Sequence, residues 1–334
     1  MSPRLRFGRG GGPDREEEAE QGRRDAESLA RLEQGHIPLA AAERLAELAR
    51  TSGEAASGRA PFASDLSVSE FALLHSLGLE PITLVVGSSI FHVGWQNVFY
   101  NAPTEFETVS HAYNEARRLA LGRLLEEAQT VGADAVVGMR IQQGAHDWAA
   151  GAVEFLAAGT AVRLPEELRS TRGPVLTALD GQEFWQLVSA GIRPVGVVAA
   201  TSVHYAPATA QTVRAMSGVF GSSWRNQELP DYTEGFYAAR HKAVGAVRHQ
   251  AQELGADGIV GVQFTQHARA HLVRQIGTME REDLIVTLHV LGTAVSDDPA
   301  LAARAGAAAT PSTVLSLGSS LAARTRARAA RSRL

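Results

Sequence analysis

Apolar residues along the chain follow one pattern twice. Two runs rich in β-branched residues, at 82–91 and 195–205, have the composition of buried β-strands. Each run is followed by a longer segment whose apolar positions recur every three or four residues, which predicts an amphipathic helix with one buried face. The positions on that face are Ala116, Ala120, Leu124, Ala128 and Val131 in the first segment, and Ala239, Ala243, Val247, Ala251 and Leu254 in the second.

Further elements flank each long helix. A short helix is expected before each β-branched run, because Ser67 and Glu70 have the three-residue spacing of a capping box, as do Asp180 and Glu183. Two more apolar runs follow each long helix and predict two further strands. They lie at 135–142 and 152–164 in the first unit, and at 258–266 and 284–295 in the second.

A seven-residue motif marks the two units as copies of one domain. GADAVVG at 132–138 returns as GADGIVG at 255–261, and its first glycine suits the end of the long helix. GTAV at 159–162 likewise returns at 292–295. Matching positions are 113 residues apart before the helix, 123 at the motif and 133 at GTAV, so two ten-residue insertions in the second copy explain the offsets. We define copy 1 as residues 62–165 and copy 2 as residues 175–298, and expect an α+β fold of two tandem β-α-β-β units, each an antiparallel sheet covered by one long helix.

Four residues of the repeat predict local structure. Gly122 and Gly245 lie at matching positions inside the long helices. Glycine there costs about 1 kcal/mol relative to alanine, so its recurrence predicts that another backbone comes close. Asp134 and Asp257 stand between helix and strand, where aspartate holds a tight turn through bonds to its own backbone. A functional carboxylate is the alternative.

These residues resemble those of a known family. The helix carrying Ala116-Arg117 or Ala239-Arg240, the GADAVVG and GADGIVG motifs and the hairpins ending in GTAV look like the YbjQ-like family, which is described as heavy-metal-binding. Tyr113 lies four residues before its arginine and Tyr237 three, so these tyrosines are not strict equivalents. The resemblance covers both copies and excludes the tails and the link between the copies.

The resemblance implies a small unit, similar to a dodecin subunit, that assembles into rings by extending sheets between neighbours. A three-stranded sheet with one helix buries little core alone and leaves exposed edges, which agrees with that expectation. We expect a homo-oligomeric ring of about five chains that serves as a non-enzymatic scaffold or binding protein. The family supplies no catalytic residues to carry over.

Composition narrows the classes of function. The chain contains no cysteine, which excludes disulfides, thiolate metal ligands and cysteine nucleophiles. A net charge of −4 over 334 residues gives no overall preference for nucleic acid. Neither an apolar targeting region nor a run long enough for a bilayer occurs, which favours a cytoplasmic protein. We expect no enzyme activity, because there is no phosphate-binding loop, dinucleotide-binding glycine pattern, HExxH or nucleophile elbow.

Histidines support an alternative function, the binding of a divalent metal such as zinc or copper. In QHARAHL, His267 and His271 share one side of a strand or helix and supply two ligands. His146 lies near them in the matching hairpin of copy 1, whereas His289 matches Leu156, an ordinary half-buried sheet position. Because no histidine set repeats in both copies, packed or solvated side chains are the competing interpretation. If a metal binds, we expect it at an interface between chains of the ring.

Three segments lie outside the repeat. Residues 1–25 are charged and glycine-rich and are expected to be disordered. Residues 26–60 predict a helical hairpin and linker, which either docks on copy 1 or binds a partner. Residues 299–334 form an alanine- and arginine-rich basic tail that either binds an acidic protein or a nucleic acid, or stays solvated. Its arginines without intervening acids are Arg324, Arg326, Arg328, Arg331 and Arg333.

Overall fold

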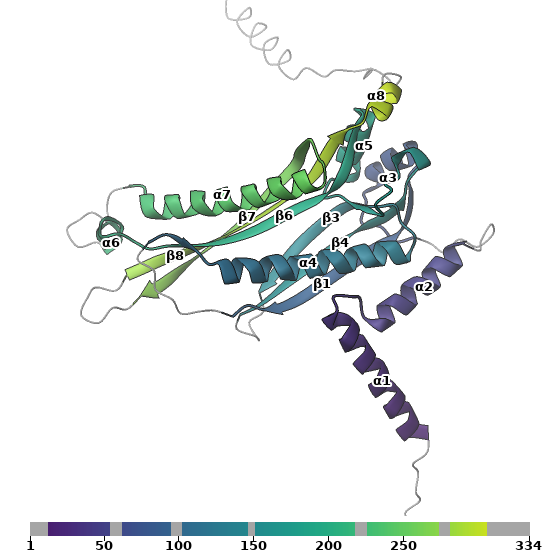
Figure 1. Ribbon diagram of the computed structural model, residues 1–334, viewed down its shortest axis with the longest axis horizontal. Coiled ribbons are helices and arrows are strands. Elements are labelled where there is room, and N and C mark those ends of the chain that lie inside the picture. The colour runs from purple at the N-terminus through teal and green to yellow at the C-terminus, as the bar shows by residue number, and fades with distance from the viewer. Residues whose placement is uncertain are drawn as a thin grey trace, which may run out of the picture.

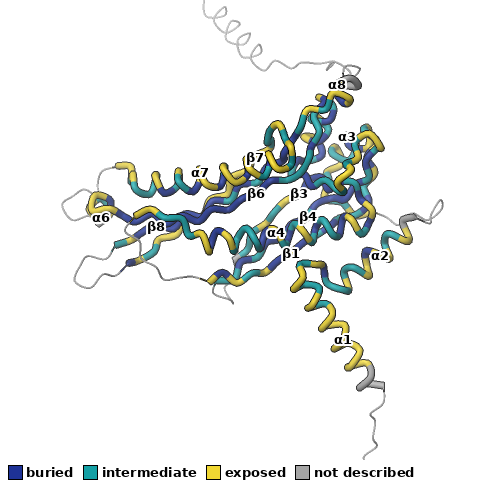
Figure 2. Tube along the Cα trace, in the orientation of Figure 1, coloured by how far each residue is buried: buried dark blue, intermediate teal, exposed yellow. Residues whose placement is uncertain are grey.

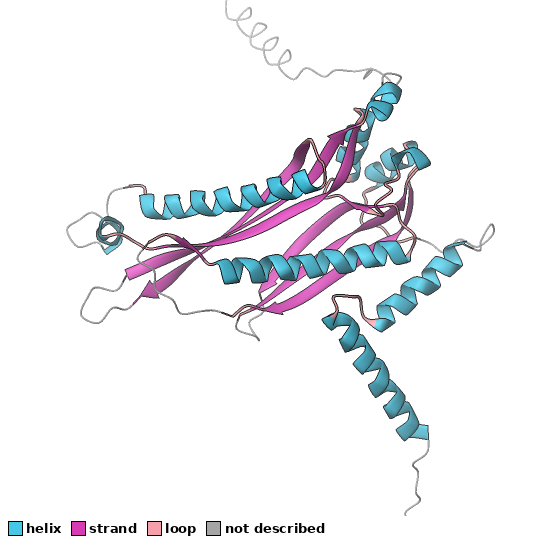
Figure 3. Cartoon of the chain, in the orientation of Figure 1, coloured by secondary structure: helices cyan, strands magenta, loops and turns pink. Residues whose placement is uncertain are grey.

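The computed structural model describes residues 13–53, 62–94, 102–145, 151–217, 226–273 and 281–305. Two α+β units follow one another along the chain, and the predicted β-α-β-β order is confirmed in both (Figure 3). A short helix precedes each unit, α3 (Val68–Ser76) and α5 (Gly181–Ser189), and both carry the predicted capping box. The elements of copy 1 are β1 (Glu80–His92), α4 (Glu107–Thr130), β3 (Ala135–Ala145) and β4 (Ala152–Arg163). Those of copy 2 are β6 (Ile192–Ala206), α7 (Pro230–Glu253), β7 (Gly258–Val273) and β8 (Arg281–Asp297).

Each sheet gains a short strand from the other copy. The strand orders are β1-β4-β3-β5 and β2-β6-β8-β7. Strand β5 (Val175–Leu176) belongs to copy 2 but pairs with β3 of copy 1, and β2 (Thr104–Glu105) belongs to copy 1 but pairs with β6 of copy 2. All pairs are antiparallel except β3 with β5. The two copies therefore exchange strands and are not independent domains on a linker.

The two units stack in layers (Figure 1). Helix α7 covers the outer face of the copy 2 sheet through the alanine-rich face predicted from the sequence. The inner face of that sheet lies against copy 1, where α4 packs on β1 and β4 and also contacts β6. A continuous core, which includes Phe155 of copy 1 and Val203 and Tyr205 of copy 2, fills the space between the copies.

The repeated glycines have backbone explanations. Gly132 and Gly255 end the long helices with φ of 67° and 72°, a conformation that favours glycine. Gly138 and Gly261, at the end of each motif, have φ of 68° and 60° and lie where the strand register shifts at a β-bulge. The seven-residue motif is thus a helix stop joined to a bulged strand.

The glycine of GTAV packs against that bulge. A Cβ atom on Gly159 would lie 2.7 Å from Cγ1 of Val136, and one on Gly292 would lie 2.7 Å from Cγ2 of Ile259. Side chains at these positions would push the neighbouring strand away. Both repeated motifs therefore serve the fold.

The prediction for the mid-helix glycines was wrong. A Cβ atom on Gly122 or Gly245 would meet nothing within 4 Å. The close approach occurs instead at Gly87 in β1, where a Cβ atom would lie 2.0 Å from the carbonyl oxygen of Ala120 and 2.4 Å from the amide nitrogen of Leu124. Glycine is needed on the strand under the helix, because the helix backbone rests directly on it.

The helical hairpin docks on copy 1. Helices α1 (Pro13–Glu33) and α2 (Leu39–Gly53) flank a turn from which Ile37 is buried, and Leu45 of α2 is buried in the same core as Leu124. The amide of Ile37 donates to Oε2 of Glu126 at 2.8 Å. Helix α1 projects away from the body (Figure 1) and begins at Pro13, so the expectation of disorder through residue 25 was wrong for 13–25.

Three short helices complete the described chain. They are a 3₁₀ helix at Glu166–Leu168, α6 (Ala210–Ser217) and α8 (Pro299–Ala305), the last of which opens the segment expected to be a basic tail. Within the described residues, every helix is too short or too polar to cross a bilayer.

Candidate functional site

The start of copy 2 extends the sheet of copy 1. Residues 175–179 run along β3 beside the bulge that follows its first three residues. Four backbone hydrogen bonds hold them there: Val175 N to Asp134 O (3.0 Å), Thr177 N to Val136 O (3.0 Å), Met139 N to Thr177 O (3.1 Å) and Gly138 N to Leu179 O (2.9 Å). The edge of copy 1 is thereby satisfied by copy 2.

The matching edge of copy 2 is open (Figure 2). Strand β7 ends its sheet, and among the described residues it pairs only with β8. Met139 of β3 is 1% exposed, whereas its counterpart Val262 in β7 is 41% exposed and Phe264 is 51% exposed. A groove of about 580 Å³, lined mainly by apolar side chains but also by Arg240 and Arg248 of α7, runs between α7 and β7 past these two side chains. Copy 2 therefore leaves uncovered the surface that copy 1 buries.

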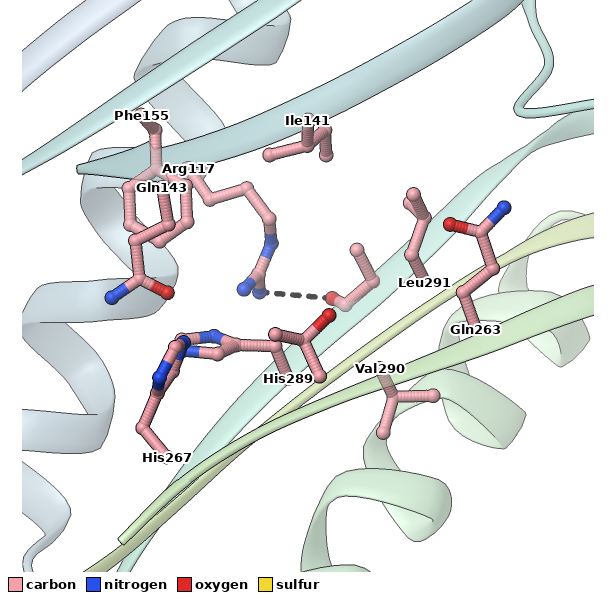
Figure 4. Close-up of a pocket in the computed structure, with 11 residues that line it drawn as sticks. Arg117, Ile141, Gln143, Phe155, Gln263, His267, His289, Val290 and Leu291 are labelled. Carbon is pink, nitrogen blue, oxygen red and sulfur yellow. Dashed lines mark hydrogen bonds between the residues drawn. The ribbon is translucent and has the colours of Figure 1, made fainter. Parts of the chain in front are cut away.

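A cavity of about 210 Å³ lies where the inner faces of the two copies meet (Figure 4). Ile141 and Phe155 line it from copy 1, and Leu291 lines it from copy 2. Six polar side chains also line it: Arg117 of α4, Gln143 of β3, His289 of β8, and Gln263, Thr265 and His267 of β7. A second cavity of about 280 Å³, which shares Gln143, adjoins it toward the ends of the strands. The site is an apolar chamber with a polar wall built by both copies.

Arg117 is a buried cation, only 6% exposed. Its guanidinium donates to Oγ1 of Thr201 at 2.5 Å, to the carbonyl oxygen of Ala199 at 3.0 Å and to Oδ1 of Asn114. Burial lowers the pKa of Arg117 to about 10, so it stays charged at neutral pH. No carboxylate in the described part of the chain pairs with it, although buried charges are ordinarily paired.

His289 completes a chain of hydrogen bonds from Arg117. Its Nδ1 lies 2.8 Å from Oγ1 of Thr201. The Thr201 oxygen accepts from Arg117, and donation of its hydroxyl proton to Nδ1 would leave the imidazole proton of His289 on Nε2. Burial, Arg117 and His267 lower the pKa of His289 to about 3, so the ring is neutral. Both Nε2 of His289 and Oε1 of Gln143 are buried without a hydrogen-bond partner in the part of the chain that the structure describes.

The histidines predicted as metal ligands are not brought together. The ring of His267 lies 5.8 Å from that of His289, whereas His271 contacts Tyr205 farther along β7. Four residues of strand separate His267 and His271 by roughly 13 Å. No group of three or more metal-ligating side chains occurs in the described ranges, and the buried Arg117 cation disfavours a metal ion beside His289. The described residues do not fit a metal centre.

Other predicted residues fall outside the described ranges. These are His146 and the tail arginines, so their proposed roles stay predictions.

Asp134 and Asp257 tie each helix-to-strand turn to the end of the hairpin. Oδ2 of Asp134 accepts from the amide of Leu164 at 2.9 Å, and Oδ2 of Asp257 accepts from the amide of Asp297 at 3.0 Å. Both bonds reach the end of the hairpin, whereas the sequence predicts bonds within the turn itself. Their position favours a structural role over a catalytic one.

The sequence interpretation missed a buried carboxylate. Asp283 is fully buried and accepts from the hydroxyl of Tyr205, the amide of Ala208 at 2.8 Å and the guanidinium of Arg281. Burial and the neighbouring Asp283 raise the pKa of Tyr205 to about 12. An acid inside an otherwise apolar strand, in REDLIV, is the signal that could have indicated it.

Comparisons with known proteins agree with the repeat. The model of the YbjQ_1 family, described as "Putative heavy-metal-binding", matches residues 84–165 and 190–297. The encapsulin nanocompartment protein Rv1762c of Mycobacterium tuberculosis is 37% identical over 209 residues, which is 61% of this chain and 77% of the relative. A UPF0145 protein of Methanococcus vannielii is 51% identical over 93 residues, 25% of this chain and 84% of that protein.

Another short relative also matches the chain. The UPF0145 protein NT01CX_0170 of Clostridium novyi is 36% identical over 91 residues, 26% of this chain and 86% of that protein. No solved structure matches the chain. The two family matches fall on the two copies in turn, and the shorter relatives have the length of about one copy. The chain belongs to the YbjQ-like (UPF0145) family and carries two tandem copies of its domain.

Proposed function

We propose that the chain is a non-enzymatic scaffold protein that assembles head to tail, with copy 2 of one chain receiving copy 1 of the next. One observation carries the proposal: copy 1 buries an edge and an apolar face against copy 2, and copy 2 presents the same edge and face uncovered. The internal contact between the copies serves as the template for the contact between chains. Exposed sheet edges of this kind favour pairing with another chain.

Copy 1 carries the complementary surface. Residues 62–66 are the counterparts of residues 175–179, and each segment is held in the same way by the threonine of its own GTAV. The amide of Asp65 donates to Oγ1 of Thr160 at 3.3 Å, and the amide of Ala178 donates to Oγ1 of Thr293 at 3.1 Å. Segment 62–66 of a neighbouring chain is therefore placed to extend β7.

The apolar back of copy 1 fits the same role. Ile90 in β1 is 58% exposed, whereas its counterpart Val203 in β6 is fully buried against copy 1. Phe62, at the start of the segment that would extend β7, is also 46% exposed. Docking on the groove of the next chain would bury both side chains.

Repetition of a head-to-tail contact closes into a ring when the rotation per chain permits it, and we propose a closed ring of about five chains. The Mycobacterium relative is named as a nanocompartment protein, which favours a role in assembly. The repeated motif residues bend strands and end helices, which leaves them no evident part in catalysis.

Native mass spectrometry of the full chain, with electron microscopy of the same sample, tests the proposal. Wild-type protein should give a closed oligomer, and Val262→Asp combined with Phe264→Asp should give smaller species, because the charges would enter an apolar interface. The matched control is Leu29→Asp on α1, where the side chain is 61% exposed on a helix that projects away from the body. A monodisperse wild-type monomer at micromolar concentration would refute the proposal.

Metal binding remains the second candidate function. The described part of the site gives it little support, but His146 has not been placed. The test is elemental analysis of wild type and of the double variant His267→Ala with His271→Ala after equilibration with zinc or copper. Stoichiometric metal that the double variant loses would establish the function, and equal metal content would reject these ligands.

A further inference from the structure

We infer that the cavity between the two copies binds a small organic acid, with its carboxylate against Arg117 and His289 and its apolar body among Ile141, Phe155 and Leu291. The inference stands on a site within one chain. It is therefore independent of the head-to-tail assembly proposed above.

Among the described residues, the polar wall of the cavity lacks an anionic acceptor. Arg117 is charged and buried, and its hydrogen-bond partners are the neutral oxygens of Thr201, Asn114 and Ala199. When the Thr201 hydroxyl donates to Nδ1, His289 presents an N–H group at Nε2, an atom that has no hydrogen-bond partner among the described residues. A buried donor without an acceptor is costly, and one beside an uncompensated cation favours an anion over a neutral group.

Gln143 supplies a third polar group. Its Oε1 is buried with no partner in the described ranges and, as Figure 4 shows, the amide faces His289 and Arg117 across the cavity. Half a turn about the last side-chain torsion presents the amide N–H₂ to a carboxylate, and this torsion is soft and roughly two-fold. The three side chains come from α4, β3 and β8, so the site exists only when the copies are packed together.

Size and lining select the rest of the ligand. A cavity of about 150 Å³ in another protein holds benzene, so the volume of about 210 Å³ admits an acid the size of benzoate. The other lining residues are apolar except Gln263, Thr265 and His267 on β7, and the apolar part, which includes Ile141, Phe155 and Leu291, suits an apolar body better than a sugar or a nucleotide. One cation and one neutral imidazole also match a single negative charge better than a phosphate dianion.

Comparison of the copies shows that this wall belongs to the internal interface. The counterpart of His289 in copy 1 is Leu156, and that of Thr201 is Ser88. Arg240, the counterpart of Arg117, is exposed on α7. A contact between chains would therefore bring Arg240 against a leucine and not a histidine. Each chain holds one such site, at the contact between its own copies.

Isothermal titration of the full chain with benzoate at neutral pH tests the inference. We expect one benzoate per chain, and roughly tenfold weaker binding to His289→Leu, which restores the copy 1 residue and keeps an apolar side chain on the strand. Gln143→Leu is a second variant that should also weaken binding. The matched control is His249→Leu on α7, whose side chain is 73% exposed and far from the cavity, and its affinity should be unchanged.

Further titrations separate the competing ligands. Benzamide, the neutral isostere, should bind much more weakly than benzoate, and equal binding would overturn the assignment of an anion site. Inorganic phosphate that displaces benzoate and binds more tightly would replace the organic acid by a free inorganic anion. Zinc binding that His289→Leu abolishes would identify a metal site instead. The absence of benzoate binding at millimolar concentrations, in both the wild type and the double variant Val262→Asp with Phe264→Asp, would refute the inference without bearing on assembly.

Discussion

Strands β3 and β7 occupy the same place in the two copies, yet the first half of β3 is buried and most of β7 is exposed. The residues of β3 at the bulge are covered by residues 175–179 and the copy 2 sheet, whereas β7 from Gly261 to Ala270 is exposed throughout. Copy 2 thus acts for copy 1 as a neighbouring subunit would. Duplication of the domain has joined one pair of copies covalently. The matching surface of copy 2 is uncovered within the chain, which leaves it accessible to another chain.

The largest expected effect concerns the contact of helix on strand. Gly87→Ala should lower the free energy of unfolding by about 5 kcal/mol, because its Cβ atom would collide with backbone atoms of α4 that cannot move separately. Copy 2 has Ala200 at this position, so we expect α7 to lie farther from its sheet than α4 does. Urea unfolding of Gly87→Ala against Ala200→Gly measures the difference. Similar losses in both variants would mean that the two helices are packed alike.

Substitution at matched positions of β3 and β7 tests the central comparison. Met139→Asp should cost about 4 kcal/mol, since the carboxylate would be buried between the copies. Val262→Asp should change the stability of the chain by less than about 0.5 kcal/mol and act only on assembly. Urea midpoints and oligomer masses at one chain concentration provide both measurements. A large loss of chain stability in Val262→Asp would show that β7 is covered within its own chain.

The sequence predicted the elements well because each rests on local periodicity. The buried face of α4, with Ala116, Ala120 and Leu124, follows from helical spacing alone, and the glycine of GADAVVG follows from its place after a helix. The same reasoning predicted a close neighbour at Gly122 and was wrong, because a glycine on a helix surface need not face a neighbour. Sequence spacing places a residue on a helix but does not say what covers it.

The cavity could not have been predicted in that way. Arg117 was noted as part of a family motif, and His289 as a half-buried sheet position. Their connection through Thr201 depends on how copy 2 packs over α4. Thr201 is 84 positions from Arg117 and 88 positions from His289 in the sequence. The useful signal was a difference between the copies: a histidine stands in copy 2 where copy 1 has Leu156.

The pH dependence of stability should sharpen that difference. The folded pKa of His289, about 3, lies below that of an unfolded histidine, mainly because of burial. Its contribution is therefore complete above about pH 6.5 and is lost as the pH falls, by about 2 kcal/mol at pH 5. The groups that face the ring are Arg117 and Tyr113 of α4 and His267 of β7. His289→Leu should remove this part of the acid destabilisation in urea unfolding at pH 7 and pH 5, and an unchanged difference would show that the ring is not buried neutral.

A smaller effect on stability is expected at the helix position whose side chain accepts a hydrogen bond from the strand below, which is an acid in copy 1 and an amide in copy 2. The amide of Val86 donates to Oε2 of Glu127 at 2.8 Å, and the matching amide of Ala199 donates to Oε1 of Gln250 at 3.0 Å. Burial raises the pKa of Glu127, so the charged form is disfavoured in the folded state and stability falls as pH rises through the folded pKa. Glu127→Gln should add about 1 kcal/mol at pH 7 and less at pH 4. A destabilised variant would indicate that Arg44, 3.9 Å away, depends on the charge.

The smallest effects concern the glycines that proved to have open space around them. Gly122→Ala and Gly245→Ala should each raise the free energy of unfolding by about 0.5–1 kcal/mol, the ordinary gain from alanine inside a helix. Gly122 has free space although copy 2 is docked beside its helix. If chains meet as the copies do, Gly245 should keep free space in the oligomer, and Gly245→Ala should leave the oligomer mass unchanged. Dissociation of the Gly245→Ala oligomer, with a stable chain and an intact Gly122→Ala oligomer, would show that the contact between chains differs from the contact between copies.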